Sequence, residues 1–352
     1  MRIAFPAFRR GFFKVTGPVI DEAIRRGHAV YLVRDYDSKP GEAVHVRELM
    51  ARWPDAVTIP RVFAAGIPVD ATIGDPSIHT MTDLPGKHYA LDFVWEQRMR
   101  PALSGVVRCW ASDYHRQLFG EPSPLDQRDY WAGPVTGMTA LDGLTAIDPV
   151  KVRASLSVPE GRTIVVLFAL KFSVPNLYRR TFFKWFPYRK LLMAVRRYCD
   201  KRDALLIIKT RTKNQDPPFV AALADHVVTD TDLYPYTALQ LMTVADLAIH
   251  FQSGAVFEAA AANVPQLAIR IPQPHIAHLP GHDVFFSRDP RSLQYWPGVV
   301  QSADLPEAIR LLDSGRVWRS VDRRAREHYA EQYLGPLDGK ASARVLDLVE
   351  RG

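Results

Sequence analysis

The residues with the clearest chemical potential lie in one stretch, where Ser253 and Gly254 follow an apolar run and precede an alanine-rich segment. A serine at this position caps a helix, and a glycine lets a ligand approach the backbone closely. The free N–H groups at a helix start favour a phosphate. Glu258 lies four residues past Gly254, one turn along the same helix face, where its carboxylate could accept hydrogen bonds from a ribose. The pattern indicates a nucleotide site, and the alternative is an ordinary helix start.

Three basic residues, Lys209, Arg211 and Lys213, lie at and just past the end of a predicted strand, Ala204–Lys209. The carboxyl ends of parallel strands are where such sheets bind ligands. These cations could neutralise a leaving diphosphate, and the site would then need no metal. The alternative is a solvated basic loop.

His250 and Tyr236 are further candidates for binding such a nucleotide, which would be the donor in a transfer reaction. His250 ends the strand that leads into the Ser-Gly turn, so it either contacts the donor or is a packed histidine. The Tyr236 ring could stack on a base, although core packing is the commoner fate of such rings.

Transfer of a group from a nucleotide donor to an acceptor hydroxyl needs a general base that removes the hydroxyl proton. Three aspartates near the ends of apolar runs are candidates for this base. They are Asp75 after Val69–Ile73, Asp92 after Tyr89–Leu91, and Asp113 after Val106–Ala111. For each of them the alternative is a turn or helix-cap aspartate.

No metal or cofactor is expected from the sequence. His275, His278 and His282 have spacings of three and four, but they lie among prolines rather than on one helix face. Phosphate-binding and dinucleotide-binding glycine motifs and the hydrolase serine elbow are all absent, which argues against kinases, dehydrogenases and hydrolases.

A basic and aromatic segment spans Lys171 to Arg202, with ten Lys and Arg residues against one acid in a chain of net charge +7. Cations interleaved with aromatic rings suit an anionic membrane surface. The alternative is an interdomain helix with its rings in the core. Nucleic acid is not expected, because no recognisable binding module is present. The residues assigned to the membrane surface are Arg179, Arg180, Phe183, Lys184, Trp185, Phe186, Arg189 and Lys190.

The composition is that of an ordinary soluble globular protein, with 47% hydrophobic and 24% charged residues in 352. The two cysteines cannot form a disulfide framework, and no apolar run approaches the length of a membrane span. We therefore expect a cytoplasmic protein, peripheral to the inner face of the cell membrane.

Strands and helices alternate along the chain, beginning with a strand at Arg2–Pro6, a helix from Pro18 to about Arg26 and a strand at Ala29–Val33. The pattern restarts near residue 145. This order predicts an α/β protein with two Rossmann-like domains facing a cleft. The expected boundaries are residues 1–145 for acceptor binding, 146–335 for the donor, and 336–352 for a C-terminal helix.

The stretch Ala245–Ile271 resembles the C-terminal domain of GT-B nucleotide-sugar glycosyltransferases, and Val135–Asp142 followed by Pro159–Thr163 resembles their interdomain junction. The chain looks in particular like the CDP-glycerol glycerophosphotransferases and related cell-surface polysaccharide enzymes. The resemblance implies that Ser253 and Gly254 hold a donor diphosphate. Gln252 departs from the pattern, and the catalytic histidine of the glycerophosphotransferases has no counterpart.

The leading hypothesis is a glycosyltransferase that moves a sugar from a nucleotide donor to a lipid-linked or surface-polysaccharide acceptor. A CDP-polyol phosphotransferase and a non-hydrolysing sugar-nucleotide epimerase keep the fold and change the chemistry. The basic and aromatic segment speaks against the epimerase. A nucleotide-binding scaffold without catalysis is the non-enzyme alternative.

Overall fold

The structure is a computed structural model, and it describes residues 1–34, 44–74, 83–92, 105–119, 133–170, 187–211, 216–230, 232–271 and 290–352. The chain divides into two compact units. We call Met1–Ala146, Asp232–Tyr236 and Ala330–Gly352 the N-terminal unit, and Ile147–Thr231 with Thr237–Tyr329 the C-terminal unit. Residues 232–236 and the last segment of the chain thus pack with the N-terminal unit, which the sequence did not indicate.

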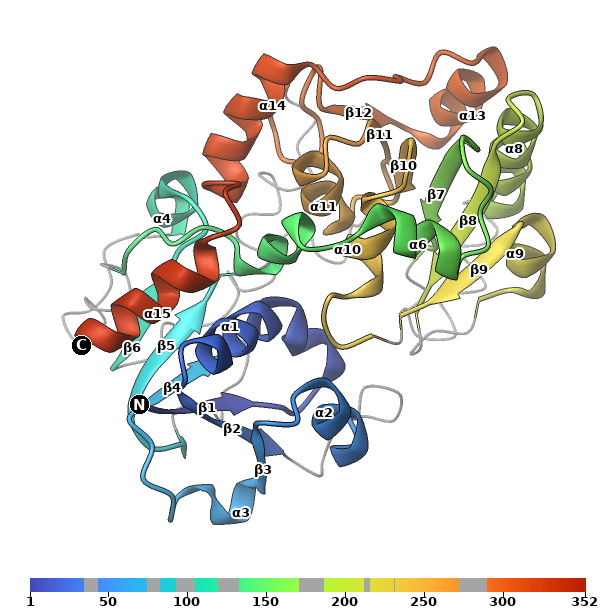
Figure 1. Ribbon diagram of the computed structural model, residues 1–352. Coiled ribbons are helices and arrows are strands. Elements are labelled where there is room, and N and C mark those ends of the chain that lie inside the picture. The colour runs from blue at the N-terminus through green and yellow to red at the C-terminus, as the bar shows by residue number, and fades with distance from the viewer. Residues whose placement is uncertain are drawn as a thin grey trace. The chain divides into compact units, whose positions relative to one another are not determined.

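The N-terminal unit is built on a six-stranded sheet in the order β3-β2-β1-β4-β5-β6, with every neighbouring pair parallel (Figure 1). The strands are β1 (Arg2–Pro6), β2 (Ala29–Arg34), β3 (Val57–Pro60), β4 (Ala71–Gly74), β5 (Lys87–Leu91) and β6 (Val106–Cys109). Its helical elements are η1 (Arg10–Phe12), α1 (Phe13–Arg25), α2 (Val46–Arg52), α3 (Arg61–Ala64), α4 (Asp113–Phe119), η5 (Thr139–Thr145), η6 (Ala330–Leu334) and α15 (Ala341–Arg351). Helix α1 contacts β1, β2 and β4 and packs beside α15, which covers the same side of the unit (Figure 1).

The C-terminal unit repeats this plan with the sheet β12-β11-β10-β7-β8-β9, again parallel throughout. The strands are β7 (Ile164–Phe168), β8 (Leu205–Thr210), β9 (His226–Thr229), β10 (Leu247–His250), β11 (Gln266–Ile269) and β12 (Val300–Ala303). Its helices are α6 (Pro149–Ser155), α8 (Tyr188–Asp200), α9 (Pro218–Leu223), α10 (Thr237–Met242), α11 (Ala255–Ala261), α13 (Leu305–Ser314) and α14 (Arg323–Tyr329). Alternate strand residues, such as Leu247 and Ile249, pack with α8 and α13 in one apolar core.

Both sheets follow the same doubly wound order when their strands are numbered from the first in each unit. In this order the winding reverses between β1 and β4, and between β7 and β10, and ligands bind at the carboxyl ends of strands beside such a reversal. The predicted α/β class with two Rossmann-like domains is confirmed. The Ser-Gly turn follows β10, and so lies at a reversal point.

Helix α1 begins at Phe13, earlier than the predicted start at Pro18, and carries the proline inside it. A proline inside a helix removes one hydrogen bond and costs about 3 kcal/mol. Burial offsets this cost, because Phe13, Val15 and Val19 are fully buried and Phe13 packs its ring 5.1 Å from that of Trp53. The apolar face therefore decides where this helix starts.

Four strands were not predicted, and three of them, β3, β9 and β12, lie at the edges of their sheets. Edge strands are less buried, and β9 shows this with no fully buried residue. The fourth, β5, opens with Lys87 and His88 before its buried residues. None of these strands has the long apolar run that marks a central parallel strand. Among the described residues, no helix is long and apolar enough to cross a membrane.

Candidate functional site

The turn between β10 and α11 has room beside it. Gly254 has helical backbone angles, with φ −58° and ψ −16°, so its backbone conformation does not require glycine. A Cβ atom placed on Gly254 would meet no other atom of the described residues within 4 Å. The Ser253 hydroxyl accepts a hydrogen bond from the Ala255 N–H at 3.3 Å, one residue inside the helix. Gly254 therefore leaves open space at a helix start instead of relieving backbone strain.

Two buried glutamines hold this turn. Gln252 adopts a left-handed conformation with φ +43°, and its side-chain oxygen accepts a hydrogen bond from the Ile271 N–H at 3.1 Å. The amide of Gln294 donates to the Ser253 carbonyl at 3.2 Å. A left-handed residue other than glycine costs about 1 kcal/mol and persists where its surroundings fix it. Gln252, which departs from the family pattern, thus joins the turn to the end of β11.

Glu258 lies where the sequence placed it, one helical turn beyond Gly254. Every residue of α11 is buried, and Glu258 itself is 5% exposed. Burial of a carboxylate is costly unless other groups interact with it. The structure therefore keeps an acid inside an otherwise apolar helix directly after the open turn.

His250 is fully buried at the end of β10. Its Nε2 hydrogen-bonds the side-chain oxygen of Gln266 at 2.9 Å, and the Gln266 amide donates to the Val256 carbonyl at 3.4 Å. Its Nδ1 has no hydrogen-bond partner among the described residues. Burial lowers the pKa of His250 to about 4, so the ring is neutral near pH 7. These contacts fit the packed-histidine interpretation, in which His250 supports α11 from the sheet.

Lys209 and Arg211 flank Thr210, the last residue of β8. The Lys209 side chain is 5% exposed and pairs with Asp230 at 3.0 Å, whereas Arg211 is half-buried. Lys209 is therefore part of a buried ion pair and not of a solvated loop. Lys213 lies outside the described residues.

Tyr236 packs within the N-terminal unit. Its ring is buried, and the Lys14 ammonium of α1 lies 4.6 Å from the ring centroid. A cation over a ring face at this distance is favourable. This environment fits core packing, and the role in stacking on a base stays a prediction.

Among the three candidate bases, Asp92 has the most developed surroundings. It follows β5 and is 5% exposed; its Oδ1 lies 2.9 Å from the Arg108 guanidinium and its Oδ2 3.1 Å from Nδ1 of His115. The backbone N–H of Ala111 donates to the same Oδ2 at 3.1 Å. Burial alone would raise the pKa of Asp92, but the charge of Arg108 and the hydrogen bond from His115 outweigh it and hold that pKa well below its usual range. An acid so stabilised as a carboxylate is a weak proton acceptor.

The other two candidates are less informative. Asp113 begins α4, and its side chain is 65% exposed and pairs with Arg116 at 2.6 Å, which is the environment of a surface aspartate. Asp75 lies outside the described residues.

The turn after β6 is tied to a segment far along the chain. The Ser112 hydroxyl accepts a hydrogen bond from the His115 N–H at 3.1 Å and donates to the Gln332 carbonyl at 2.7 Å. The Tyr333 ring stands edge-on to Tyr114 at 5.4 Å and lies 6.3 Å from the His115 ring. The segment η6, which supplies Gln332 and Tyr333, is a π-helix, a geometry common at functional sites.

Sequence reasoning missed Arg108, His115 and Gln294. Arg108 and Gln294 lie in stretches without a motif, and their partners are 16 and 41 residues away. His115 lies 23 residues from Asp92, and a spacing of this length carries no signal that a sequence pattern would show.

The remaining predictions fall mostly outside the described residues. Arg189 and Lys190 of the basic and aromatic segment are exposed on α8, and the other six membrane-surface candidates are not described. The three loop histidines are not described either. Within the described ranges, no group of three or more His, Cys, Asp or Glu side chains could hold a metal ion.

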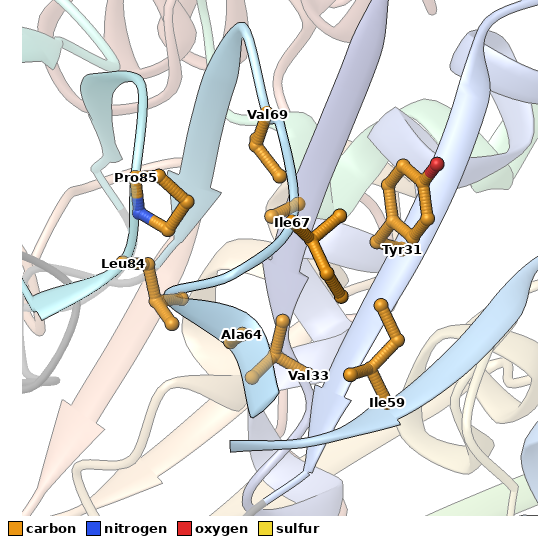
Figure 2. A pocket seen from close by; sticks show the side chains of 9 residues that line it. Tyr31, Val33, Ile59, Ala64, Ile67, Val69, Leu84 and Pro85 are labelled. Atoms are coloured by element: carbon orange, nitrogen blue, oxygen red, sulfur yellow. The ribbon is translucent and has the colours of Figure 1, made fainter. Parts of the chain in front are cut away.

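An apolar recess in the N-terminal unit is not a ligand site. Figure 2 shows its lining side chains, which include Val33 and Ile59 beside Leu84, with the Tyr31 hydroxyl at one side. It has essentially no space for a water molecule. Binding sites combine an apolar cavity with a few convergent polar groups, and this recess lacks both the room and the polar groups.

Two doubly wound units with this strand order define a fold class, the GT-B fold. No family model matches the chain, and no curated protein matches its sequence.

Solved structures of similar fold cover essentially the whole chain. A UDP-GlcNAc 2-epimerase from Neisseria meningitidis bound to UDP-GlcNAc is 12% identical, with a TM-score of 0.56 and complete coverage of both chains. The S. aureus MnaA–UDP structure is 13% identical, with a TM-score of 0.55, and covers 99% of this chain and 96% of its own. A structure of the wall teichoic acid polymerase TagF with CDPG is 10% identical, with a TM-score of 0.61, and covers 99% and 88%. Identities this low show a shared fold.

Proposed function

We propose that this protein is a GT-B glycosyltransferase that binds a nucleotide-activated sugar on its C-terminal unit. In this proposal it transfers the sugar to a lipid-linked or surface-polysaccharide acceptor at the cytoplasmic membrane face, without a metal. The observation that carries the proposal is the open space beside Gly254 at the β10–α11 turn, followed one turn later by the buried Glu258. The turn follows a strand at the reversal point of a doubly wound sheet, where such folds bind nucleotides.

The groups at the carboxyl edge of the C-terminal sheet suit a nucleoside diphosphate. The backbone N–H groups at the start of α11 and the half-buried Arg211 at the end of β8 favour the phosphates. The Glu258 carboxylate is an acceptor for the two ribose hydroxyls. Because His250 stays neutral beneath the helix, it adds no charge that would compete for the phosphates.

Two other reactions keep the same donor site. The solved neighbours include UDP-GlcNAc 2-epimerases and the TagF polymerase with CDPG, so epimerisation and polyol-phosphate transfer are the second candidates. The products separate the three. A glycosyltransferase releases the nucleotide with a new glycosidic bond, a polyol phosphotransferase releases CMP with a new phosphodiester, and an epimerase returns a nucleotide sugar without needing an acceptor.

The first test is calorimetry with UDP, GDP, ADP, dTDP, CDP and CMP. We expect one nucleotide to bind with a Kd of roughly micromolar order, equivalent to about −8 kcal/mol. Glu258→Gln removes the charged acceptor for the ribose, and we expect it to weaken that binding by about tenfold or more.

Glu307→Gln is the matched control, because Glu307 also lies in the first turn of a helix of the same unit, α13, but is half-buried rather than buried. It should bind the nucleotide as the wild type does. If no nucleotide binds, or if Glu258→Gln and Glu307→Gln behave alike, the donor site is not at this turn.

A further inference from the structure

The helices on one side of the C-terminal sheet carry a basic surface. Helices α8 and α13 contact one another, and each packs one side into the apolar core, so that its other side faces solvent (Figure 1). We call the exposed cations of this surface the basic face. They are Arg189, Lys190, Arg197 and Lys201 of α8 and its C-cap, and Arg310 and Arg316 in and just after α13.

The outward side of α8 carries its cations at a helical spacing. Arg189, Met193 and Arg197 follow one another at intervals of four residues, and Lys201 continues the series at the C-cap. All four are exposed, whereas Leu192 on the inward side is fully buried. Residues four apart lie on one face of a helix, so these side chains form one stripe. At a rise of about 1.5 Å per residue, the stripe is about 18 Å long.

Helix α13 continues the same face. The Arg197 guanidinium lies 2.9 and 3.2 Å from the two carboxylate oxygens of Asp313. The Lys201 ammonium donates to the Asp313 backbone carbonyl at 3.2 Å. Arg310 is exposed one turn before Asp313, and Arg316 is exposed three residues after it. The cations of the two helices therefore share one surface.

Most cations of the basic face have no acidic partner among the described residues. Asp313 is already paired with Arg197. Asp200, the exposed acid of α8, pairs with Arg196, which is not part of the face. Like charges that are close together repel one another, and an external anion relieves this repulsion. The cations that form no ion pair in the described part of the chain are Arg189, Lys190, Arg310 and Arg316.

The stability of the helices does not explain all of these cations. Lys201 and Arg316 lie at helix C-termini, where a cation interacts favourably with the helix dipole. Arg189 and Lys190 lie in the first turn of α8, which contains no acid. At this positive end of the dipole a cation is unfavourable. The first turn of α8 thus holds two exposed cations that the helix itself does not favour, and an anion outside the chain would stabilise them.

The arrangement suits an extended anionic surface rather than one small anion. Cations spread over about 18 Å cannot converge on a single phosphate, whereas a bilayer presents headgroup phosphates side by side. Met193, 44% exposed in the middle of the stripe, suits the boundary between headgroups and acyl chains. Nucleic acid is less suited, because single strands stack on aromatic rings and the two rings of these helices, Tyr188 and Tyr198, are buried.

We propose that the basic face binds an anionic membrane surface and brings the enzyme to an acceptor in that membrane. The inference rests on the proposed function, which supplies the lipid-linked acceptor. It concerns a surface separate from the proposed donor site. The partner is identified by its chemistry, a bilayer rich in lipids with a negatively charged headgroup.

The basic face and the donor turn can be tested separately because they lie on different parts of the C-terminal unit. Leu247 and Ile249 of β10 pack with α8 and α13. Successive strand residues point to opposite sides of a sheet, so His250 points to the other side. There Gln266 joins His250 to the Val256 carbonyl of α11. The basic face and α11 are therefore on opposite sides of the sheet.

The test is co-sedimentation of the full chain with vesicles of equal parts phosphatidylglycerol and phosphatidylcholine, or of phosphatidylcholine alone. We expect the wild type to bind the first and not the second, and to be released by high salt, since salt screens exposed charges. Arg310→Gln with Arg316→Gln removes two exposed cations from the face. This double variant should lower the partition onto anionic vesicles by about 25-fold, at about fivefold for each cation near the surface.

Lys151→Gln with Arg324→Gln is the matched control. Both residues are exposed in the same unit, and this double variant changes the net charge by the same amount. Lys151 lies in α6, which contacts α10. Arg324 lies in α14, whose Arg326 donates to the Ala260 carbonyl of α11. The control cations are thus on the side of the sheet opposite the basic face, and their removal should leave vesicle binding and thermal unfolding as in the wild type.

Calorimetry with the nucleotides on the same samples separates this proposal from the donor site. Both double variants should keep the wild-type nucleotide affinity. The proposal is overturned if the wild type does not bind anionic vesicles, or if the two double variants bind them equally well. It is also overturned if the basic face binds a single-stranded oligonucleotide and no vesicle. A wild type that binds anionic vesicles in the expected way but no nucleotide would overturn the donor site and support the basic face.

Discussion

The two sheets share one strand order and differ in what their carboxyl edges carry. In the C-terminal unit the strand ends hold the neutral His250–Gln266 pair, an open turn and a helix start. In the N-terminal unit they hold the Asp92 carboxylate and the Arg108 guanidinium next to the His115 imidazole. The helix start at the first edge favours an anion, whereas the second edge carries ionisable side chains that contact one another. The fold thus supplies the positions, while the side chains after each strand decide the chemistry.

The two buried histidines make the difference concrete. The partner of His250 is a neutral amide, and burial lowers the pKa of the ring by more than the hydrogen bond with Gln266 raises it, so that this pKa falls to about 4. The partner of His115 is the carboxylate of Asp92, which lies 3.1 Å from Nδ1 of the ring. One ring is thus paired with a neutral amide and the other with an acid.

The largest expected loss of stability comes from breaking the buried ion pair between Arg108 and Asp92. Arg108→Met leaves the Asp92 carboxylate buried without its cation, and removing one partner of a buried pair costs about 3–5 kcal/mol. We expect urea unfolding at pH 7 to show a loss of this size. Replacing both residues, in Arg108→Met with Asp92→Leu, should recover part of it. A loss below about 1 kcal/mol for Arg108→Met would mean that the pair contributes little to stability.

The pH dependence of stability should sharpen the contrast between the histidines. Because the folded pKa of His250 lies below its unfolded value of about 6.5, its contribution is complete above pH 6.5 and is lost as the pH falls toward 4. The shift corresponds to about 3 kcal/mol. His250→Gln should therefore lose less stability than the wild type between pH 6.5 and 4, by about this amount, in urea titrations at each pH.

Asp92 acts in a different window. Its pKa is lowered by folding, so its contribution is present above the unfolded value of about 3.9 and is lost only below it. The two effects can thus be separated by pH. Equal slopes for the wild type and His250→Gln would show that His250 is not buried as a neutral ring.

The smallest effect tests the open turn. Gly254→Val adds a side chain where, in the described part of the chain, no atom lies within 4 Å, so the free energy of unfolding should change by no more than about 0.5–1 kcal/mol. The same side chain occupies the space proposed for the donor phosphates, and we expect nucleotide affinity to fall by about tenfold or more, or 1.4 kcal/mol.

Gly66→Val in the N-terminal unit is the control, since the nearest atom to a Cβ there is 3.7 Å away. It should leave nucleotide affinity unchanged. If Gly254→Val binds the nucleotide normally, the open space beside the turn is not the donor site.

The sequence was sufficient for the central elements of both units. Apolar runs mark β1, β7 and β10, and the glycine and alanine pattern after β10 marks the turn and α11. These features depend on neighbouring residues, so the chain expresses them locally. For the same reason the local pattern alone predicts the places of Ser253, Gly254 and Glu258, because one short segment positions all three.

The tertiary structure alone decided the rest. The start of α1 depends on packing between Phe13 and Trp53, and the edge strands depend on their neighbours. Arg108 and His115 meet Asp92 only because β5 and β6 pair in parallel, with Leu91 beside Cys109, and α4 begins directly after β6. Local sequence determines which residues become strands and helices. Which charges meet across them depends on strand order and register, because those bring distant side chains into one low-dielectric site.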